Sequence, residues 1–534
     1  MTKFPSSVLP GFAEQCQGVG PVELLPQSDS RMAVINCPSE VLKSLAEFLV
    51  HSLHYRFGSL VVEAPPNQWK LIYLFYRREN PSLVQLCVWL KSDHPRVDSI
   101  SDKIHSADWH ERQAEDLFGL VFTGHPRLGD FVLHEEWPEG VNPMRTGFSA
   151  THPVKEQVVD PAWRPARILE TPGAFLMPIG PVYADYYESA QFFLETVGED
   201  VVRMIPRFFF KYRGVEKLAE GQPWQRVLLM AERFSGTSAI AHSTALCAAL
   251  EQIYQIQPPP RALGLRLILA EIERIRHHFA VLSDICHASG MSVPSAQMDI
   301  LEEQALRLSG QCAGHRYLYG WVTLGGLNRD MTPAALDTIA RETQLLAKAS
   351  AAIYSALQFT SSFLDRFEGV GAISAAGAQE LALVGPIARA SGVRTDLRLM
   401  LPYGPYAQDT GFSAMTEPLE QEGDGYARIR VLFAEIQQSV KLIDATVAAL
   451  PTGPVRVEAG GVRGQSAFGW AEAPNGAAFH YVRLDAQGCV LRCQIATPSF
   501  ANWHGFHIAA ENFAFQDFPI MMASFGLSIA ESDR

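Results

Sequence analysis

The chain has 534 residues, 47% of them hydrophobic and 19% charged, which indicates a globular protein with a large core and about two to four domains. Its formal net charge of −13 argues against a nucleic-acid backbone as the partner. No run of about 18 apolar residues is present, so we expect no membrane-spanning helix. The segment MTKFPSSVLPGF lacks the apolar centre of a secretory signal, and we expect a cytoplasmic protein.

The first part of the chain has an α+β pattern. Residues 1–30 are interpreted as an N-terminal extension and residues 31–135 as a domain. MAVINCPSEVLKSLAEFLVHSL has helical apolar spacing, whereas SLVVEA, KLIYLFYRR and SLVQLCVWL are typical of strands separated by turns. This order predicts an antiparallel sheet with a helix. Residues 136–170 are rich in Pro and lack periodicity, so they are interpreted as a linker.

Residues 171–534 form the second predicted domain. Between residues 215 and 450, long segments place apolar residues at helical spacing, which predicts a helical bundle. From residue 455 onward the chain returns to strand-like runs, which predicts a small β element. The eight cysteines include no CxxC pair, so neither a cluster motif nor a disulfide framework is expected.

One motif in the first domain resembles a known family. HERQAEDLFGLVFTGHPRLGDFVL is similar to the signature of the 30-kDa subunit of respiratory complex I. The matching residues are Glu111-Arg112, Asp116, Phe118-Gly119, Phe122 and Gly124-His125-Pro126. The resemblance implies an α/β sandwich domain that docks onto neighbours, with His125 packed in a turn.

The second domain resembles the 49-kDa subunit of complex I and the large subunit of membrane-bound [NiFe] hydrogenases. A fusion of the two parts looks most like the formate-hydrogenlyase type of large subunit. The stretches that carry this resemblance are Gly180-Pro181 with Glu188; Lys211 to Lys217; Glu232-Arg233 with Ala241-His242-Ser243; Ala270 to Arg274 with His278; Gly325-Gly326 with Asp330; Gly385-Pro386 with Arg389 to Gly392, Asp396, Arg398, Pro402 and Tyr403; and Ser524 with Glu531 to Arg534.

The hydrogenases of this family hold nickel and iron with four cysteines, and this chain has none at the matching positions. Those positions are Ser235, Ser238, Ser528 and Glu531. Soft metals prefer thiolates, and an alcohol stays protonated near neutral pH. We therefore expect no [NiFe] centre and no metal bound by this chain.

Complex I uses the corresponding cavity for quinone, and its two usual headgroup donors are also replaced. The histidine of the family motif falls on Tyr187 and the tyrosine falls on Gly236. Tyr183 or Tyr187 could supply a phenol donor, and they could equally well pack a hairpin turn. By the same resemblance, Glu188 lies at the cavity mouth as a proton-relay carboxylate whose pKa burial would raise.

Two further residues are implied to lie near a [4Fe-4S] cluster held by a partner subunit. A cationic Arg213 would raise the potential of that cluster, and His278 would couple protonation to its reduction. The alternative for His278 is a helix-buried histidine bonded to backbone. Arg389, Asp396 and Arg398 are implied to line the cavity, and the alternative for these three is a structural ion-pair network.

The resemblance implies a large subunit of an NAD(P)H/quinone-type or related oxidoreductase that couples electron transfer, with quinone as an acceptor, to proton translocation. Implied partners are an iron-sulfur small subunit, a ferredoxin-like subunit and membrane antiporter-like subunits, at the cytoplasmic face of the cell membrane. Two alternatives stay open. One is a non-redox scaffold that couples a recruited activity to a pump-like partner, and the other is a true hydrogenase.

Overall fold

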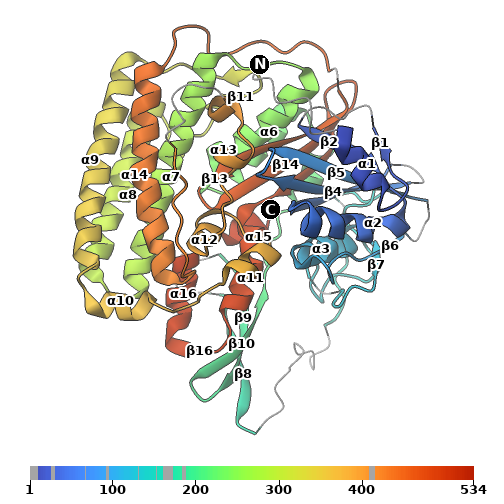
Figure 1. The fold of residues 1–534 in the computed structure, drawn as a ribbon, viewed down its shortest axis with the longest axis horizontal. Coiled ribbons are helices and arrows are strands. Elements are labelled where there is room, and N and C mark those ends of the chain that lie inside the picture. The colour runs from blue at the N-terminus through green and yellow to red at the C-terminus, as the bar shows by residue number, and fades with distance from the viewer. Residues whose placement is uncertain are drawn as a thin grey trace.

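The computed structural model describes residues 10–25, 31–65, 68–91, 95–129, 131–151, 153–159, 172–182, 188–407, 415–462 and 464–534. The chain is a mixed α+β molecule, as predicted (Figure 1). An N-terminal sheet with its helices lies on one side, long helices lie on the other, and β13 (Ser466–Ala473) and β14 (Gly476–Leu484) lie between them.

The N-terminal sheet has the strand order β1-β2-β5-β4-β3. It is mixed rather than antiparallel, because β2 and β5 pair in parallel after the chain crosses between them through a helix and a hairpin. The elements are β1 (Glu23–Leu24), β2 (Met32–Asn36), α2 (Ser39–Glu47), η1 (Phe48–Ser52), β3 (Arg56–Glu63), β4 (Trp69–Arg77) and β5 (Ser82–Leu90). The segment MAVIN, assigned to a helix from its apolar spacing, is strand β2. The helix starts only after Pro38, which holds the preceding backbone extended.

Helix α3 (Asp108–Phe118) carries the 30-kDa-type motif, and its polar residues bind backbone. The carboxylate of Asp116 accepts hydrogen bonds from the N–H groups of Phe131, Val132 and Leu133 at 2.6–3.1 Å. Gly119 ends the helix at φ 73°, and a Cβ there would lie 2.4 Å from Asn142 Oδ1. The motif therefore builds this turn and the segment that follows it.

The helical bundle predicted for residues 215–450 is present. Its long helices are α5 (Trp224–Arg233), α6 (Ala239–Tyr254), α7 (Pro260–Ala288), α8 (Ser292–Ala313), α9 (Pro333–Leu357) and α14 (Gly425–Ala449). Helix α7 packs against both α8 and α14, and α9 closes the group against α8 and α14 (Figure 1). The short helices are α4 (Val215–Ala219), α10 (Ser361–Phe367), α11 (Ala375–Glu380), α12 (Gly385–Ala390) and α13 (Leu397–Met400).

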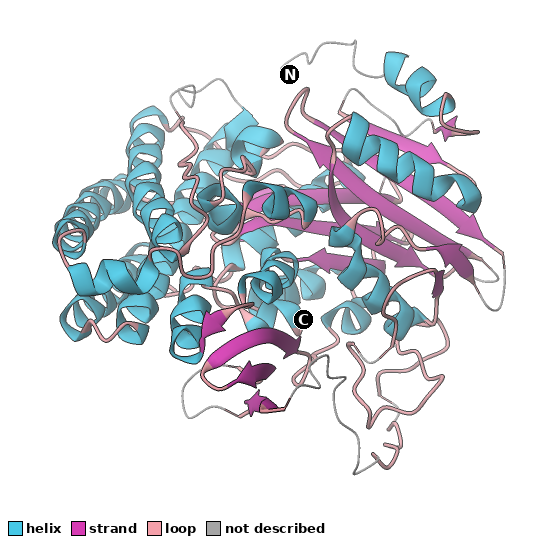
Figure 2. Ribbon diagram, turned by 60° about the horizontal axis from the view of Figure 1, so that its bottom comes forward, coloured by secondary structure: helices cyan, strands magenta, loops and turns pink. Residues whose placement is uncertain are grey.

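Two further sheets complete the fold. Figure 2 shows most long helices in one half of the molecule and the largest sheet in the other. Strands β13, β14 and β15 (Val490–Ala496) form an antiparallel sheet against α6. Strands β8 (Ala174–Ile179), β9 (Gln191–Val197), β10 (Asp200–Arg207) and β16 (Phe513–Ala514) form a second antiparallel sheet. Helices α15 (Pro498–Ala509), α16 (Phe518–Phe525) and α17 (Ile529–Ser532) follow β15, where only strand and turn character was expected.

Buried polar contacts join the N-terminal sheet to the C-terminal one. Glu63 at the end of β3 accepts hydrogen bonds from Tyr481 Oη at 2.6 Å and from Arg483 at 2.7 Å. Arg534 reaches Gln113 in α3 at 3.2 Å and Glu216 in α4 at 3.3 Å. The boundaries proposed at residues 135 and 170 stay predictions. Among the described helices, none is long and apolar enough to cross a membrane.

Candidate functional site

The loop between α5 and α6 and the segment around α17 bring the four expected thiolate positions into one neighbourhood. Ser238 Oγ donates to Glu531 Oε1 at 2.8 Å, although the two residues are distant in sequence. Ser528 accepts the backbone N–H of Glu531 at 3.3 Å, and so caps α17. Ser235 is linked to this group through Thr237, whose hydroxyl lies 2.8 Å from Ser235 Oγ and 3.4 Å from Ser238 Oγ.

Glu531 is the centre of this buried polar group. Its second oxygen accepts a hydrogen bond from Ser499 at 2.5 Å, and His242 Nε2 lies 3.5 Å from the first. Burial alone would raise the pKa of Glu531, but His242, Ser499 and Ser238 together lower it. His242 Nδ1 lies 3.0 Å from His480 Nε2. Sequence signals included His242 in a family stretch, whereas nothing local singled out His480 or Ser499.

This donor set does not fit a nickel-iron centre. The oxygen atoms of Ser238 and Glu531 already hydrogen-bond each other, and no thiolate is present at any of the four positions. Across the described part of the chain, no group of three or more His, Cys, Asp or Glu side chains is arranged to hold a metal ion. We therefore derive no step through a metal at this position.

A second buried group contains the residues predicted to line the cavity. Arg398 in α13 donates to Asp396 at 2.7 Å and to Glu271 of α7 at 2.9 Å. Arg274, one turn further along α7, donates to Glu271 at 3.2 Å. Tyr406 Oη also donates to Glu271, at 2.6 Å. These side chains are buried, so each charge depends on its neighbours rather than on water.

Arg389 extends this network toward His278. It donates to Glu435 of α14 at 2.5 Å and to Glu472 of β13 at 3.0 Å. The other oxygen of Glu435 lies 2.9 Å from His278 Nε2. Burial lowers the pKa of His278 and the hydrogen bond to Glu435 opposes this shift, so the imidazole is neutral near pH 7. The partner of His278 is thus a carboxylate rather than the backbone group of the simpler alternative.

Taken together, the network holds four carboxylates and three guanidinium groups. The carboxylates are Glu271, Asp396, Glu435 and Glu472, and the guanidinium groups are Arg274, Arg389 and Arg398. Burial and the charge of Asp396 raise the pKa of Glu472, whereas the arginines lower those of Glu271 and Glu435 against the effect of burial. Glu472 is therefore the carboxylate that takes up a proton most readily. Glu435 and Glu472 carry no local sequence signal.

Arg213 and Glu188 form an ion pair away from this network. Arg213 donates to Glu188 at 2.8 Å, and the two side chains are 33% and 32% exposed. The full burial assumed for Glu188 is therefore not found. The backbone N–H of Arg213 donates to the Asp533 carbonyl at 2.9 Å. Among the described residues no hydrogen bond or ion pair joins Arg213 to His278. Tyr183 and Tyr187 lie outside the described residues.

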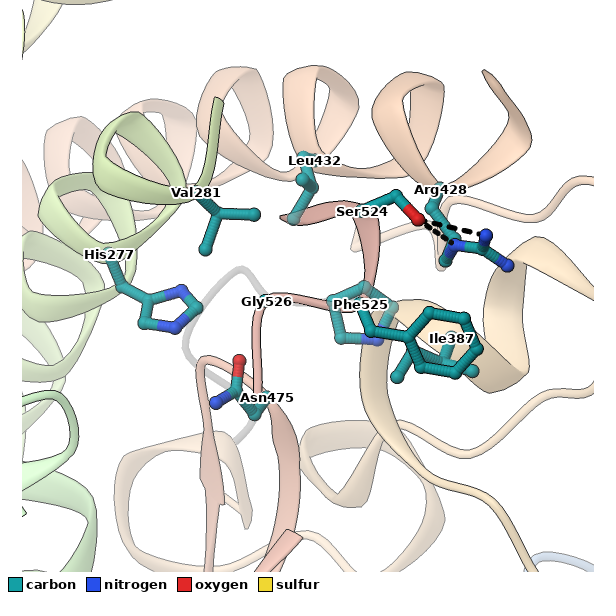
Figure 3. Close-up of a pocket in the computed structure, with 10 residues that line it drawn as sticks. His277, Val281, Ile387, Arg428, Leu432, Asn475, Ser524, Phe525 and Gly526 are labelled. Carbon is teal, nitrogen blue, oxygen red and sulfur yellow. Dashed lines mark hydrogen bonds between the residues drawn. The ribbon is translucent and has the colours of Figure 1, made fainter. Parts of the chain in front are cut away.

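A small cavity lies beside the network (Figure 3). His277 and Asn475 both line it, opposite Ser524 and Gly526. Its volume is about 10 Å³, enough for one water molecule and too small for an organic substrate. His277 Nδ1 lies 3.3 Å from His278 Nδ1, so a water here would sit next to the chain of polar groups.

Comparison with protein families identifies two regions. Residues 35–154 match the family described as respiratory-chain NADH dehydrogenase, 30 Kd subunit. Residues 290–463 and 461–534 match the family described as respiratory-chain NADH dehydrogenase, 49 Kd subunit. One polypeptide therefore contains both regions.

Several curated proteins are similar along most of their length. Formate hydrogenlyase subunit 5 of Escherichia coli (strain K12) is 28% identical over 84% of this chain and 78% of its own length. Hydrogenase-4 component G of the same organism is 27% identical over 83% of this chain and 77% of its own length. The C/D subunit of the NADH-quinone oxidoreductase of Acinetobacter baumannii (strain AYE) is 25% identical over 88% and 85% respectively.

Proposed function

We propose that this chain, a fused subunit of the complex I 30-kDa/49-kDa type related to hydrogenase large subunits, couples electron transfer to ion translocation in a membrane-associated complex. It would pack against an iron-sulfur small subunit that holds a [4Fe-4S] cluster and pass electrons to a quinone-type acceptor. A ferredoxin-like subunit and antiporter-like membrane subunits would complete the complex at the cytoplasmic face.

The observation that carries this proposal is the buried charge network between His278 and Arg398. Burying charged groups is costly unless each is paired, and here Arg389 and Arg398 each serve two carboxylates on different elements. Glu472, with its raised pKa, would gain or lose a proton when a nearby charge changes. Such a network can pass the electrostatic effect of electron transfer through the bundle.

A second function is favoured by a different observation. Glu531 and the serines around it fill the former metal position with hydrogen bonds, which suits a scaffold that has lost redox chemistry. In that case the partner small subunit would also lack cluster cysteines. A true hydrogenase is disfavoured by the same donor set, and stoichiometric nickel in the purified chain would restore it.

Substitution of Arg213 by Met in the native complex tests the proposal. Arg213 is a partly exposed cation, and its loss leaves the Glu188 carboxylate without its counter-charge. Less positive charge near the cluster disfavours its reduced form, so the midpoint potential followed by EPR should fall by tens of millivolts. Arg316→Met, which breaks the surface pair with Glu303, is the matched control and should leave the potential unchanged.

An unchanged potential in the Arg213 variant would remove this residue from the cluster environment. A native complex without any iron-sulfur EPR signal would favour the scaffold function instead.

A further inference from the structure

The loop between α8 and β11 (Val322–Thr323) carries a stack of aromatic rings beside the Gly236 loop. His315 and Tyr319 stack with ring centroids 4.5 Å apart, and Tyr317 lies 6.1 Å from Tyr319. The guanidinium of Arg233 lies over the Tyr319 ring at 4.9 Å, and that of Arg276 lies over Tyr317 at 5.3 Å. This arrangement combines flat faces with positive charge.

The backbone around Tyr319 is held in place by buried partners. The N–H of Gly320 donates to Glu232 Oε1 at 2.8 Å, and Asn328 donates to the Gly320 carbonyl at 3.1 Å. Trp321 Nε1 donates to the Ala313 carbonyl at 2.7 Å. Leu318 has a left-handed φ of 60°, which a non-glycine residue adopts only where its surroundings enforce it. The position of the Tyr319 side chain is thus set by the fold.

The Tyr319 hydroxyl lies at the one position of the loop that lacks a side chain. A Cβ built on Gly236 would lie 3.8 Å from Tyr319 Oη, and no other atom would lie within 4 Å. Gly236 itself is exposed and separates Ser235 from Thr237 and Ser238. Arg276 donates to the Thr237 carbonyl at 3.0 Å, which ties this loop to the helix that also carries His278.

We infer that Tyr319 supplies the phenol hydroxyl that hydrogen-bonds a carbonyl oxygen of the quinone-type acceptor at the mouth of the Gly236 loop. The inference rests on the proposed function and specifies its acceptor subsite. The tyrosine expected in sequence at Gly236 is thereby replaced from a different segment of the chain. Arg233 and Arg276 would stabilise the negative charge that the acceptor ring gains on reduction.

The state of the hydroxyl fits this role. Burial raises the pKa of Tyr319, and this outweighs the lowering effect of Arg233, so the phenol keeps its proton near pH 7 and can donate it in a hydrogen bond. Tyr319 acts here as a positioning residue, and no proton or electron need leave it.

The test measures the Kd of the purified native complex for decylubiquinone and for menadione without a reductant, by equilibrium dialysis. Tyr319→Phe should raise the Kd about tenfold, as expected for one lost hydrogen bond. The double variant Tyr319→Phe with Gly236→Tyr places a phenol on the facing residue and should recover most of the affinity. Tyr426→Phe is the control, because Arg430 lies over the Tyr426 ring at 5.0 Å in a similar arrangement on α14.

Each other outcome has a defined meaning. A wild-type complex that binds neither quinone overturns the quinone part of the proposed function and this inference with it. Wild-type binding with an unchanged Kd in the Tyr319 variant overturns only the inference. An unchanged Kd accompanied by loss of the small subunit on purification would identify the aromatic loop as a protein-docking surface, which also overturns it.

Discussion

Buried carboxylates on this chain differ in their acid–base behaviour according to their partners. Arginine neighbours lower the pKa of Glu435 against the effect of burial. Glu273 on α7 is also fully enclosed, but its carboxylate accepts only from the backbone N–H groups of Ile240 and Ala241, at 2.7 and 3.1 Å. Burial therefore dominates and raises the pKa of Glu273 to about 7. Two neighbouring acids thus end in opposite protonation states near neutrality.

This difference predicts how stability depends on pH. Between about pH 4.3 and 7 the folded protein keeps the Glu273 proton that the unfolded chain releases, so this residue makes stability fall as pH rises through that window. In Glu273→Gln, the loss in unfolding free energy from pH 5 to 7.5 should be smaller than in the wild type by about 2–3 kcal/mol.

Urea unfolding at both pH values measures the effect, and Glu368→Gln at an exposed position is the control. An identical pH dependence in wild type and Glu273→Gln would mean that Glu273 is already ionised in the folded protein at pH 5.

At the scale of elements, the site depends on a close approach of α6 to β13. A Cβ on Gly469 would lie 2.0 Å from the Ala245 carbonyl oxygen. Alanines on both elements line the same contact: Ala241, Ala245, Ala471, Ala473 and Ala478. Small residues let the helix lie directly on the sheet. This contact sets His242 of α6 against His480 of β14.

Gly469→Ala should therefore separate the two elements and destabilise the protein by about 1–3 kcal/mol, as overpacking does. Gly460→Ala is the control, because a Cβ there would meet no atom within 4 Å. Denaturant unfolding of both variants is the measurement. Equal stability of the two would show that the sheet can shift without cost.

At the scale of the whole molecule, the N-terminal sheet is joined to the rest through buried acids. Glu63 binds Tyr481 and Arg483, and Glu216 in α4 binds Arg492 at 3.0 Å and Arg534 at 3.3 Å. Removing one member leaves the others buried without a partner, which costs more than the contact itself. The two regions matched by different families are thus expected to unfold together.

Glu63→Ala should weaken this joint by about 2–4 kcal/mol, because the Tyr481 hydroxyl and Arg483 lose their acceptor. Hydrogen exchange should then show residues 31–91 opening before the helical bundle. Asp102→Ala, which breaks the exposed pair with Lys43, should change stability by less than about 1 kcal/mol. Uniform exchange in the Glu63 variant would place the joint elsewhere.

The sequence by itself determined the α+β class, the bundle and the C-terminal strands, because periodicity is a local property of the chain. It did not reveal strand β2 or the parallel pairing with β5, since pairing depends on the path between strands. Among the site residues, the sequence pointed to His278, Arg389, Asp396 and Arg398. Only the tertiary structure added Glu435, Glu472, His480, Ser499 and Tyr319. These side chains come from elements far apart in the chain and meet through packing, which no local pattern encodes.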